Sequence, residues 1–295
     1  MMGRMATIGT FDGVHRGHRS VLAELCSRCQ AKGMKPLVVT FDRHPLELIA
    51  PERAPRMLMS VEERCEMLRR YVPDVVVVTF DESVRRLTAA EFMAKLRVDY
   101  GVDALLLGFN HRFGSDKLQS FEQFEAEAAK VGIEIFKGAE AGEDGQRFSS
   151  TIIRQSLAAG NVDIAAKCLS RPYRIIGTVG AGKQLGRKIG FPTANIEPLY
   201  ERQMVPMTGV YACVVSLTDG QSYQAMVNIG VRPTVDDSGH VTIEAHLFDF
   251  DGDLYGSAVA LDFIGRIRAE KQFGSIEELK QQLHIDAITA REILV

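Results

Sequence analysis

Gly9-Thr10-Phe11-Asp12-Gly13-Val14-His15-Arg16-Gly17-His18 connects a short apolar run to an amphipathic segment. The run Met5–Thr10 is expected to form a strand, and a helix is expected to begin near Gly17. The first amide groups of a helix have no partner within it and carry partial positive charge, so they attract phosphate. The stretch therefore predicts a strand, a tight glycine-bearing turn and a phosphate-binding helix N-terminus.

The same alternation of apolar runs and amphipathic segments continues as far as residue 157. Four more strands are expected at Pro36–Phe41, Val75–Phe80, Ala104–Gly108 and Ile133–Phe136. Capping boxes predict helix starts at Ser60-x-x-Glu63, Thr88-x-x-Glu91 and, in the Gln variant, Ser120-x-x-Gln123. The apolar runs lack polar alternation, which is typical of a parallel sheet covered on both faces. The pattern predicts an α/β domain with a Rossmann-like doubly wound parallel sheet, whose ligands bind at the carboxyl ends of the strands.

The second half of the chain has a different pattern. A short helix is expected at Val162–Leu169, followed by a connector that ends at Pro172. Antiparallel strands are then expected at Arg174–Val179, Gly209–Leu217, Ser222–Ile229, Val241–Phe250 and Ser257–Ile264, with hairpin turns at Asp219-Gly220 and Asp251-Gly252. Five or six such strands predict a small antiparallel β-barrel, followed by a C-terminal helix with a capping box at Ser275 and Glu278. We expect two domains, residues 1–170 and 171–295.

Composition limits the class of protein. The 295 residues carry a net charge of −3 at pH 7, which gives no reason to expect a nucleic-acid partner. No apolar run approaches the roughly 18 residues of a membrane helix, so no membrane partner is expected. Five cysteines, an odd number, suit reduced thiols in the cytoplasm. Cys26 and Cys29 share a helical stripe with Leu22 and Leu25, which favours core packing over a metal or redox role.

Two histidines follow the first turn. His15 and His18 are three residues apart, so they can lie on one face of the helix start and donate to phosphoryl oxygens. Two other interpretations remain open, namely a pair of capping histidines or two ligands of a zinc ion. No third zinc ligand is close in the sequence, and phosphate binding is favoured.

A second glycine-rich stretch, Gly177–Lys183, is one residue short of a Walker A loop. Gln184 stands where a serine or threonine would bind magnesium, and two later glycines break any following helix, so a P-loop is rejected. Backbone amides around Gly182 can still approach a nucleotide closely, with Lys183 near its phosphates.

Two extended segments place polar side chains on one face. Thr193 and Asn195 point the same way and offer oxygens suited to magnesium, although Pro192-Thr193-Ala194-Asn195 is also typical of a turn. Glu244 shares a face with Thr242 and His246, opposite an apolar set formed by Val241, Ile243, Ala245 and Leu247. If the apolar set fills the barrel core, Glu244 lies on the accessible face, where it is either catalytic or merely solvated.

Four ordered motifs in the first half carry a family resemblance. They are Gly9–His18, Thr40–Pro45, Gly108–Gly114 and Ser149–Arg154. Together they resemble the FMN adenylyltransferase module of the bifunctional prokaryotic riboflavin kinase/FMN adenylyltransferases, or FAD synthetases, a nucleotidyltransferase domain. The resemblance implies that FMN attacks the α-phosphorus of ATP and that pyrophosphate leaves. It assigns catalysis to His15, His18 and Arg154, ATP binding to Gly9, Phe11, Gly17, Ser149, Ser150 and Thr151, and the flavin and nucleotide pocket to Asn110. On their own, Ser149–Thr151 predict only a helix N-cap.

The second half resembles the riboflavin kinase module of the same family. The matching segments are Gly182–Asn195, Gly209–Tyr211, Asn228–Thr234, Glu244–Gly256 and Arg268–Phe273. The resemblance implies ATP, Mg²⁺ and riboflavin as ligands, with Thr193 and Asn195 holding Mg²⁺. Glu244 would take the proton of the riboflavin 5′-hydroxyl. Gly182 and Lys183 would contact ATP, and Arg268 the flavin or its phosphate.

These observations predict a bifunctional cytoplasmic enzyme that converts riboflavin to FMN and FMN to FAD. One rival is a single active module beside an inactive one. Another is a flavin-binding regulator that acts on nucleic acid, which the acidic net charge disfavours.

Overall fold

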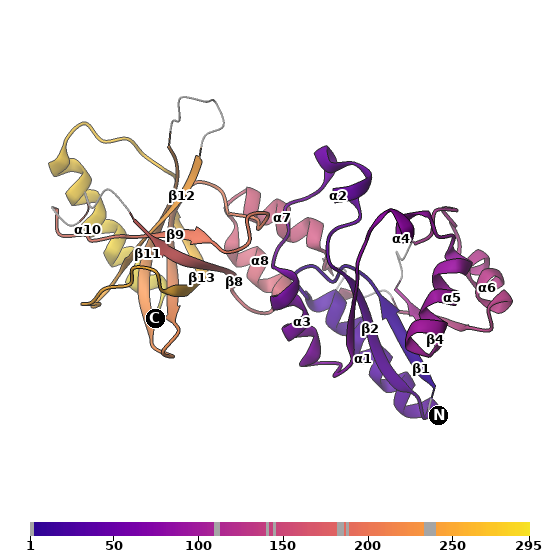
Figure 1. Ribbon diagram of the computed structural model, residues 1–295. Helices are drawn as coiled ribbons and strands as arrows, with labels where there is room; N and C mark the ends of the chain where they lie inside the picture. Colours follow the sequence, from indigo (N-terminus) through magenta and orange to yellow (C-terminus); the bar gives the residue numbers. More distant parts are fainter. Residues whose placement is uncertain are drawn as a thin grey trace. The chain divides into compact units, whose positions relative to one another are not determined.

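The computed structural model describes residues 3–108, 113–139, 142–143, 146–181, 186, 189–232 and 240–295. Contacts divide the chain into two compact units, residues 1–149 and 150–295 (Figure 1). The expected boundary at 170/171 rests on composition, whereas by contacts α7 (Ser150–Ala158) and α8 (Val162–Leu169) belong to the second unit. No helix within the described ranges is long and apolar enough to cross a membrane.

The first unit is built on a five-stranded parallel sheet in the order β3-β2-β1-β4-β5. Its strands are β1 (Arg4–Ile8), β2 (Lys35–Phe41), β3 (Val75–Val78), β4 (Val102–Leu107) and β5 (Glu134–Lys137). All five lie where apolar runs predict them. The chain runs outward from β1 to β2 and β3, then returns to β4 on the other side of β1, which creates a switch point between β1 and β4. The predicted Rossmann-like doubly wound sheet is confirmed.

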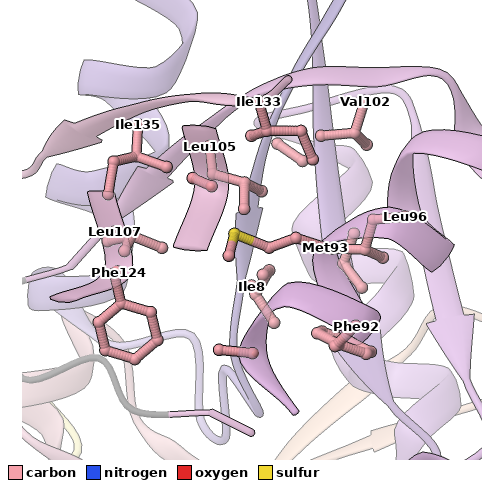
Figure 2. Packing of buried hydrophobic residues seen from close by; sticks show 14 of the residues in the cluster. Ile8, Phe92, Met93, Leu96, Val102, Leu105, Leu107, Phe124, Ile133 and Ile135 are labelled. Carbon is pink, nitrogen blue, oxygen red and sulfur yellow. The ribbon is translucent and has the colours of Figure 1, made fainter. Parts of the chain in front are cut away.

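Helices cover both faces of this sheet. The helices of this unit are α1 (Arg16–Lys32), α2 (Leu46–Ile49), α3 (Val61–Arg69), α4 (Glu82–Arg86), α5 (Ala89–Tyr100) and α6 (Phe121–Lys130), and α1, α3, α5 and α6 contact the sheet. The unit also has a 3₁₀ turn η1 (Pro51–Arg53) and a hairpin of β6 (Gly142–Glu143) and β7 (Gln146–Arg147). Met5 of β1 packs in one cluster with Leu22 of α1. Ile8 packs in the opposite cluster with Met93 and Leu96 of α5 (Figure 2). The two sides of β1 thus face separate cores.

The cysteine pair of α1 belongs to the core, as predicted. Cys29 is buried beside Leu22 and Leu25, and Cys26 is partly buried against the same cluster. Burial raises the pKa of the Cys29 thiol to about 11, which suppresses the reactive thiolate. All five cysteines, each within the described ranges, are free thiols.

Three helix starts in the first unit are capped as predicted. The hydroxyls of Ser60, Thr88 and Ser120 each accept a hydrogen bond from the N–H three residues further on. The side chain at that third position accepts a hydrogen bond from the N–H of the capping residue, so both halves of each capping box are present.

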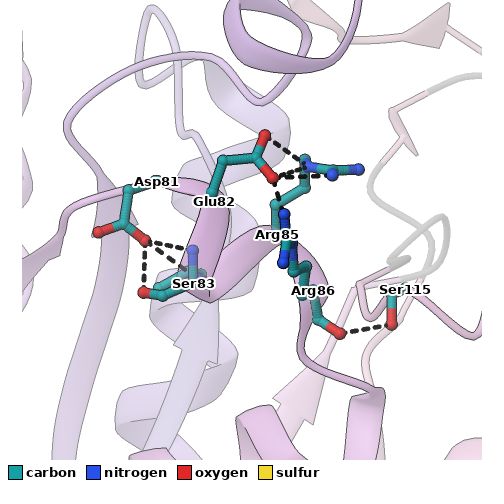
Figure 3. A network of polar contacts seen from close by, with 7 residues as sticks. Asp81, Glu82, Ser83, Arg85, Arg86 and Ser115 are labelled. Carbon is teal, nitrogen blue, oxygen red and sulfur yellow. Dashed lines mark hydrogen bonds and ion pairs between the residues drawn. The ribbon is translucent and has the colours of Figure 1, made fainter.

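A polar network at α4 holds the chain segment that follows β4 (Figure 3). Asp81 caps α4 by accepting hydrogen bonds from the N–H groups of Ser83 and Val84 at 2.9 and 3.0 Å. The hydroxyl of Ser83 also donates to this carboxylate, and this bond, followed by the backbone N–H bonds, lowers the pKa of Asp81. Ser115 donates from its hydroxyl to the carbonyl of Arg86 at 2.8 Å. The chain that leaves the carboxyl end of β4 is therefore anchored to α4.

The second unit is a closed antiparallel barrel in the order β10-β11-β12-β9-β8-β13. Its strands are β8 (Tyr173–Gly180), β9 (Ala194–Pro198), β10 (Gly209–Leu217), β11 (Ser222–Arg232), β12 (His240–Leu247) and β13 (Ala258–Arg268). The predicted barrel is confirmed, and β9 is the sixth strand. The predicted C-terminal helix is α10 (Ile276–Ile293), which packs on β10, β11 and β13.

Only half of the predicted capping box of α10 forms. The hydroxyl of Ser275 accepts a hydrogen bond from the N–H of Glu278 at 3.2 Å. The carboxylate of Glu278 accepts its bond from the N–H of Gly274 at 3.0 Å, one residue before the position that a capping box requires.

The apolar face of β12 fills the barrel core, as predicted, except at its first member. Ile243, Ala245 and Leu247 are 2, 0 and 7% exposed. Val241 is 45% exposed, so the condition that the whole apolar set fills the core does not hold at this residue. Its cross-strand partner Val231 is 46% exposed, because this end of the β11–β12 pair extends beyond the core.

Helix α5 offers a matched pair of substitutions that tests the core of the first unit. Leu96 is fully buried, whereas Val98 is 83% exposed. Leu96→Ala should lower the free energy of unfolding by about 2–5 kcal/mol, because it removes buried methyl groups and leaves a cavity. Val98→Ala should change it by less than about 0.5 kcal/mol. Urea denaturation of the full chain followed by circular dichroism measures both, and equal effects would contradict this packing.

Candidate functional sites in both units

The turn after β1 has an unusual backbone conformation. Phe11 and Val14 have φ angles of 48° and 41°, which bulky and β-branched residues rarely adopt. The buried carboxylate of Asp12 accepts hydrogen bonds from the N–H of Leu58 at 2.9 and 3.1 Å. Arg19 of α1 donates to the carbonyl of Val14 at 3.2 Å. These contacts hold the turn in a conformation that local preferences oppose.

His15 is the N-cap of α1. Its Nδ1 accepts a hydrogen bond from the N–H of His18 at 3.3 Å, so in the neutral ring the proton lies on Nε2. The rings of His15 and His18 stack with their centroids 3.6 Å apart. The capping interpretation is therefore confirmed for His15. It is compatible with phosphate binding, because capping uses Nδ1 and the ring proton lies on Nε2.

His18 lies in the first turn of α1 with an unused ring nitrogen. Burial, followed by the electrostatic effects of His15 and Arg64, lowers its pKa well below the ordinary value of 6.5. Its Nδ1 is buried and has no hydrogen-bond partner among the described residues. The fold thus leaves a neutral imidazole with hydrogen-bonding capacity beside a helix N-terminus.

The glycines at the two ends of this turn allow close packing. A Cβ at Gly17 would lie 3.0 Å from the carbonyl oxygen of Phe148 and 3.1 Å from the His15 ring. A Cβ at Gly9 would lie 3.2 Å from the ring of Phe11. Five of the predicted residues therefore gather at the carboxyl end of β1, and they are Gly9, Phe11, His15, Gly17 and His18.

The other residues predicted for this site lie further along the chain. Asn110 is outside the described residues. Ser149 is the last residue of the first unit, and α7 of the second unit begins at Ser150. This helix start agrees with the N-cap predicted within Ser149–Thr151. Thr151 and Arg154 follow within α7. Their association with the two histidines stays a prediction.

In the second unit, Glu244 lies in the middle of β12. It is directly opposite Asn195 of β9 and Asn228 of β11 in the barrel register. Directly opposed residues place their side chains on the same face, close enough to interact. A carboxylate and two amides therefore gather on one face of the barrel.

A cavity of about 290 Å³ adjoins this face, and we call it the helix-side cavity because α10 contributes to it. Its polar lining includes Thr193, Asn228 and Glu244. Its apolar lining comes from Ile189, Phe191, Val210, Met226, Phe273, Leu279 and Leu283. The cavity lining thus combines many apolar side chains with a small group of oxygen-bearing side chains.

Arg268 also lines the helix-side cavity. Its Nε and Nη2 form a two-point ion pair with the buried carboxylate of Asp286 of α10, at 2.9 and 2.7 Å. Nη1 donates to the carbonyl of Ala269 at 2.9 Å. The guanidinium is therefore held in place by the protein itself, and its predicted contact with the flavin or phosphate stays a prediction.

A second cavity of about 290 Å³ lies beside the turn after β12, and we call it the turn-side cavity. Its lining residues are Val179, Gly180, Pro192, Thr193, Ala194, Ala245, Leu247, Phe250, Asp251, Gly252, Asp253, Leu254 and Tyr255. Thr193 therefore lines both cavities. Gly182 and Lys183, predicted to contact ATP, lie outside the described residues.

Two residues of this site were missed as candidates in the sequence. Asn228 stands in a quoted family segment, but only the barrel register places it opposite Glu244. His246 shares a face with Glu244 by its spacing, yet spacing alone suggests no partner for it. The i, i+2 spacing from Glu244 was the signal in the sequence that could have made His246 a candidate.

The two units together define a class of enzyme, a two-domain transferase of phosphorus-containing groups. Residues 2–152 match the family described as FAD synthetase, and residues 169–294 match the family described as riboflavin kinase. Curated relatives named bifunctional riboflavin kinase/FMN adenylyltransferase share 40% identity in Pseudomonas fluorescens (99% of this chain, 93% of the relative) and 39% in Escherichia coli K12 (98% and 92%). The chain belongs to the bifunctional riboflavin kinase/FMN adenylyltransferase family.

A solved structure supports the same fold over the whole chain. The structure titled a macrolide-efflux protein from Streptococcus pneumoniae has a TM-score of 0.87 and 30% identity, covering 98% of this chain and 94% of that one. The activity named in that title belongs to that protein. In the present chain, the C-terminal domain phosphorylates riboflavin to FMN with ATP, and the N-terminal domain adenylylates FMN to FAD.

The buried Nδ1 atom of His18 leads to a prediction about the titration of this ring. In NMR titrations of the imidazole protons, His18 should stay neutral well below pH 6.5, because burial opposes the charged form. An unfolded chain would take up a proton near pH 6.5. The stability that His18 contributes is therefore complete above that pH and is lost as the pH falls through the folded-state pKa. A pKa at or above 6.5 in the folded protein would contradict the burial argument.

Proposed function

We propose that the helix-side cavity binds riboflavin and the turn-side cavity binds ATP in the kinase reaction. The apolar lining of the first suits a flavin ring. The second is lined by Gly180, two residues before the stretch Gly182-Lys183 that we propose contacts the ATP phosphates. The observation that carries this assignment is that Thr193 lines both cavities, since phosphoryl transfer requires the two substrates to meet.

Thr193 and Asn195 are the proposed ligands of Mg²⁺. Hydroxyl and amide oxygens beside a carboxylate are hard donors of the kind that Mg²⁺ accepts. The register places Asn195 directly opposite Glu244, so the donor set fits a divalent cation. When bound, Mg²⁺ would neutralise charge on the ATP phosphates.

Glu244 is the proposed general base. An alcohol becomes a good nucleophile only as its proton leaves, so riboflavin phosphorylation benefits from a carboxylate beside the 5′-hydroxyl. Glu244 lines the helix-side cavity together with Thr193, which supports this role. Arg268, held by Asp286, would present its positive charge to the flavin or its phosphate on the same cavity wall.

For adenylyl transfer, we propose that His15, His18 and the N-terminus of α1 stabilise charge on the α-phosphoryl group. The attacking phosphate of FMN is an anion at pH 7, so positioning and charge stabilisation suffice. Gly9, Phe11 and Gly17 would shape the ATP site around them. The proposed partners of the leaving pyrophosphate are Ser149, Ser150, Thr151 and Arg154, and Asn110 would contact the nucleotide and flavin.

The proposed setting is the cytoplasm, with small-molecule substrates and no nucleic-acid partner. Five free thiols, four of them buried, suit a reducing compartment. The net charge of −3 gives no electrostatic reason to bind nucleic acid.

Glu244→Gln tests the kinase assignment. It should lower riboflavin phosphorylation by about 10²- to 10⁴-fold, the usual contribution of a general base. FAD formation from supplied FMN should not change, because that reaction belongs to the other domain. Glu197→Gln, which changes an exposed glutamate of β9 that lines neither cavity, is the matched control. Chromatography of the flavins measures both reactions, and equal loss of both activities would contradict separable sites.

His18→Ala tests the adenylyl transferase site. It should lower FAD formation by about 10²- to 10³-fold, as loss of a charge-stabilising donor does. The variant should convert riboflavin to FMN at the normal rate, so FMN should accumulate. A thermal melt controls for loss of folding. A folded variant with normal FAD synthesis would remove His18 from the site.

A further inference from the structure

His246 is a residue of the kinase domain to which the proposed reaction assigns no role. It lies two residues after Glu244 on β12 and lines the helix-side cavity. Its Nδ1 lies 2.7 Å from the carbonyl oxygen of Pro192, on the segment just before β9. This hydrogen bond joins residues 54 positions apart in the sequence.

The direction of this hydrogen bond follows from its chemistry. A carbonyl oxygen only accepts, so Nδ1 must carry the proton and donate. The ring packs edge-on against Phe191, with centroids 5.2 Å apart, and against Phe248, with centroids 5.6 Å apart. Burial lowers the pKa of His246, which favours the neutral ring with its single proton on Nδ1. The donor is therefore fixed in both orientation and tautomer.

The hydrogen bond lies where backbone pairing between β9 and β12 ends. The last cross-strand pair in that direction is Ala245 with Ala194. Thr193 and Pro192 lie beyond it, so the strand ladder does not hold them. The side chain of His246 takes the place of the missing ladder contact.

We propose that His246 is a positioning residue of the riboflavin kinase reaction, because its bond to Pro192 holds Thr193 at the junction of the two cavities. The inference rests on the proposed roles of Thr193 and Glu244. His246 acts through the backbone of Pro192–Thr193, and no proton moves through its ring. Loss of the bond would leave Thr193 free to move away from Glu244 while both side chains remain in the chain.

Two substitutions at His246 separate the hydrogen bond from the packing of the ring. In His246→Asn, the side-chain amide nitrogen takes nearly the place of Nδ1 and can donate to Pro192, but the ring contacts with Phe191 and Phe248 are lost. In His246→Phe, the ring is kept and the donor is lost. The proposal expects kcat/KM for ATP in riboflavin phosphorylation to fall about tenfold to a hundredfold in His246→Phe, because a displacement of about 1 Å in a group that positions substrate can cost that much. His246→Asn should retain clearly more activity.

The reverse order, with His246→Phe more active than His246→Asn, would show that packing alone matters and would overturn the proposal. FAD formation from supplied FMN should be unchanged in both variants, and thermal melts show that they fold. A two-bond ¹H–¹⁵N correlation spectrum of the full chain reports the tautomer directly. It should show His246 protonated on Nδ1 in the absence of any substrate, and protonation on Nε2 alone would also overturn the proposal.

A double-mutant cycle with Thr193→Ala tests whether His246 acts through Thr193. Removing the donor should cost little once Thr193 is gone, so the two losses should be strongly non-additive. Additive losses would contradict action through Thr193. Normal kinase activity in Thr193→Ala alone would instead refute the proposed metal role of Thr193, and the tautomer spectrum would still decide whether the bond to Pro192 exists.

Discussion

Both candidate sites lie where a backbone hydrogen-bond ladder ends and polar groups must find other partners. In the first unit, β1 ends at Ile8 and α1 begins at Arg16, so a bent turn and a helix N-terminus lie together at the proposed phosphate site. The side chain of His15 satisfies one of the first amides of α1. In the second unit, pairing of β9 with β12 stops at Ala194, and His246 satisfies the next exposed carbonyl. Each site thus depends on a histidine that closes the end of a regular element.

His18, next to His15 in the first site, and His246 in the second site share one electrostatic property. Burial lowers the pKa of both His18 and His246, so both rings are neutral at pH 7. A neutral imidazole is a hydrogen-bonding group of defined direction, and its tautomer is set by the partner that it meets. His15 accepts through Nδ1, whereas His246 donates through Nδ1. The Nδ1 atom of a histidine is therefore a hydrogen-bond acceptor in the first unit and a donor in the second.

The features that could be predicted from the sequence are those decided by neighbouring residues. The five sheet strands follow from local apolar runs, and the caps at Ser60, Thr88 and Ser120 need only residues three positions apart. β9 has a single buried residue, Ile196, so its strand character comes from pairing with β8 and β12. The Asp12–Leu58 contact spans 46 residues, and both cavities combine distant segments. No local pattern signals these features, and only the resemblance assigned Thr193 and Glu244 to one site.

The two domains use a carboxylate differently, because one nucleophile is an ionised phosphate and the other is an alcohol. Asp12, in the first site, is buried and accepts two hydrogen bonds from the N–H of Leu58, so its charge stabilises the turn. The phosphate of FMN is already ionised, and a base would add nothing to its attack. Glu244, in the second site, lines a cavity beside Thr193, and there we propose that it takes the proton of the riboflavin hydroxyl. Under the proposed mechanism, one carboxylate shapes the backbone of its domain and the other takes a proton from the substrate, as the two nucleophiles require.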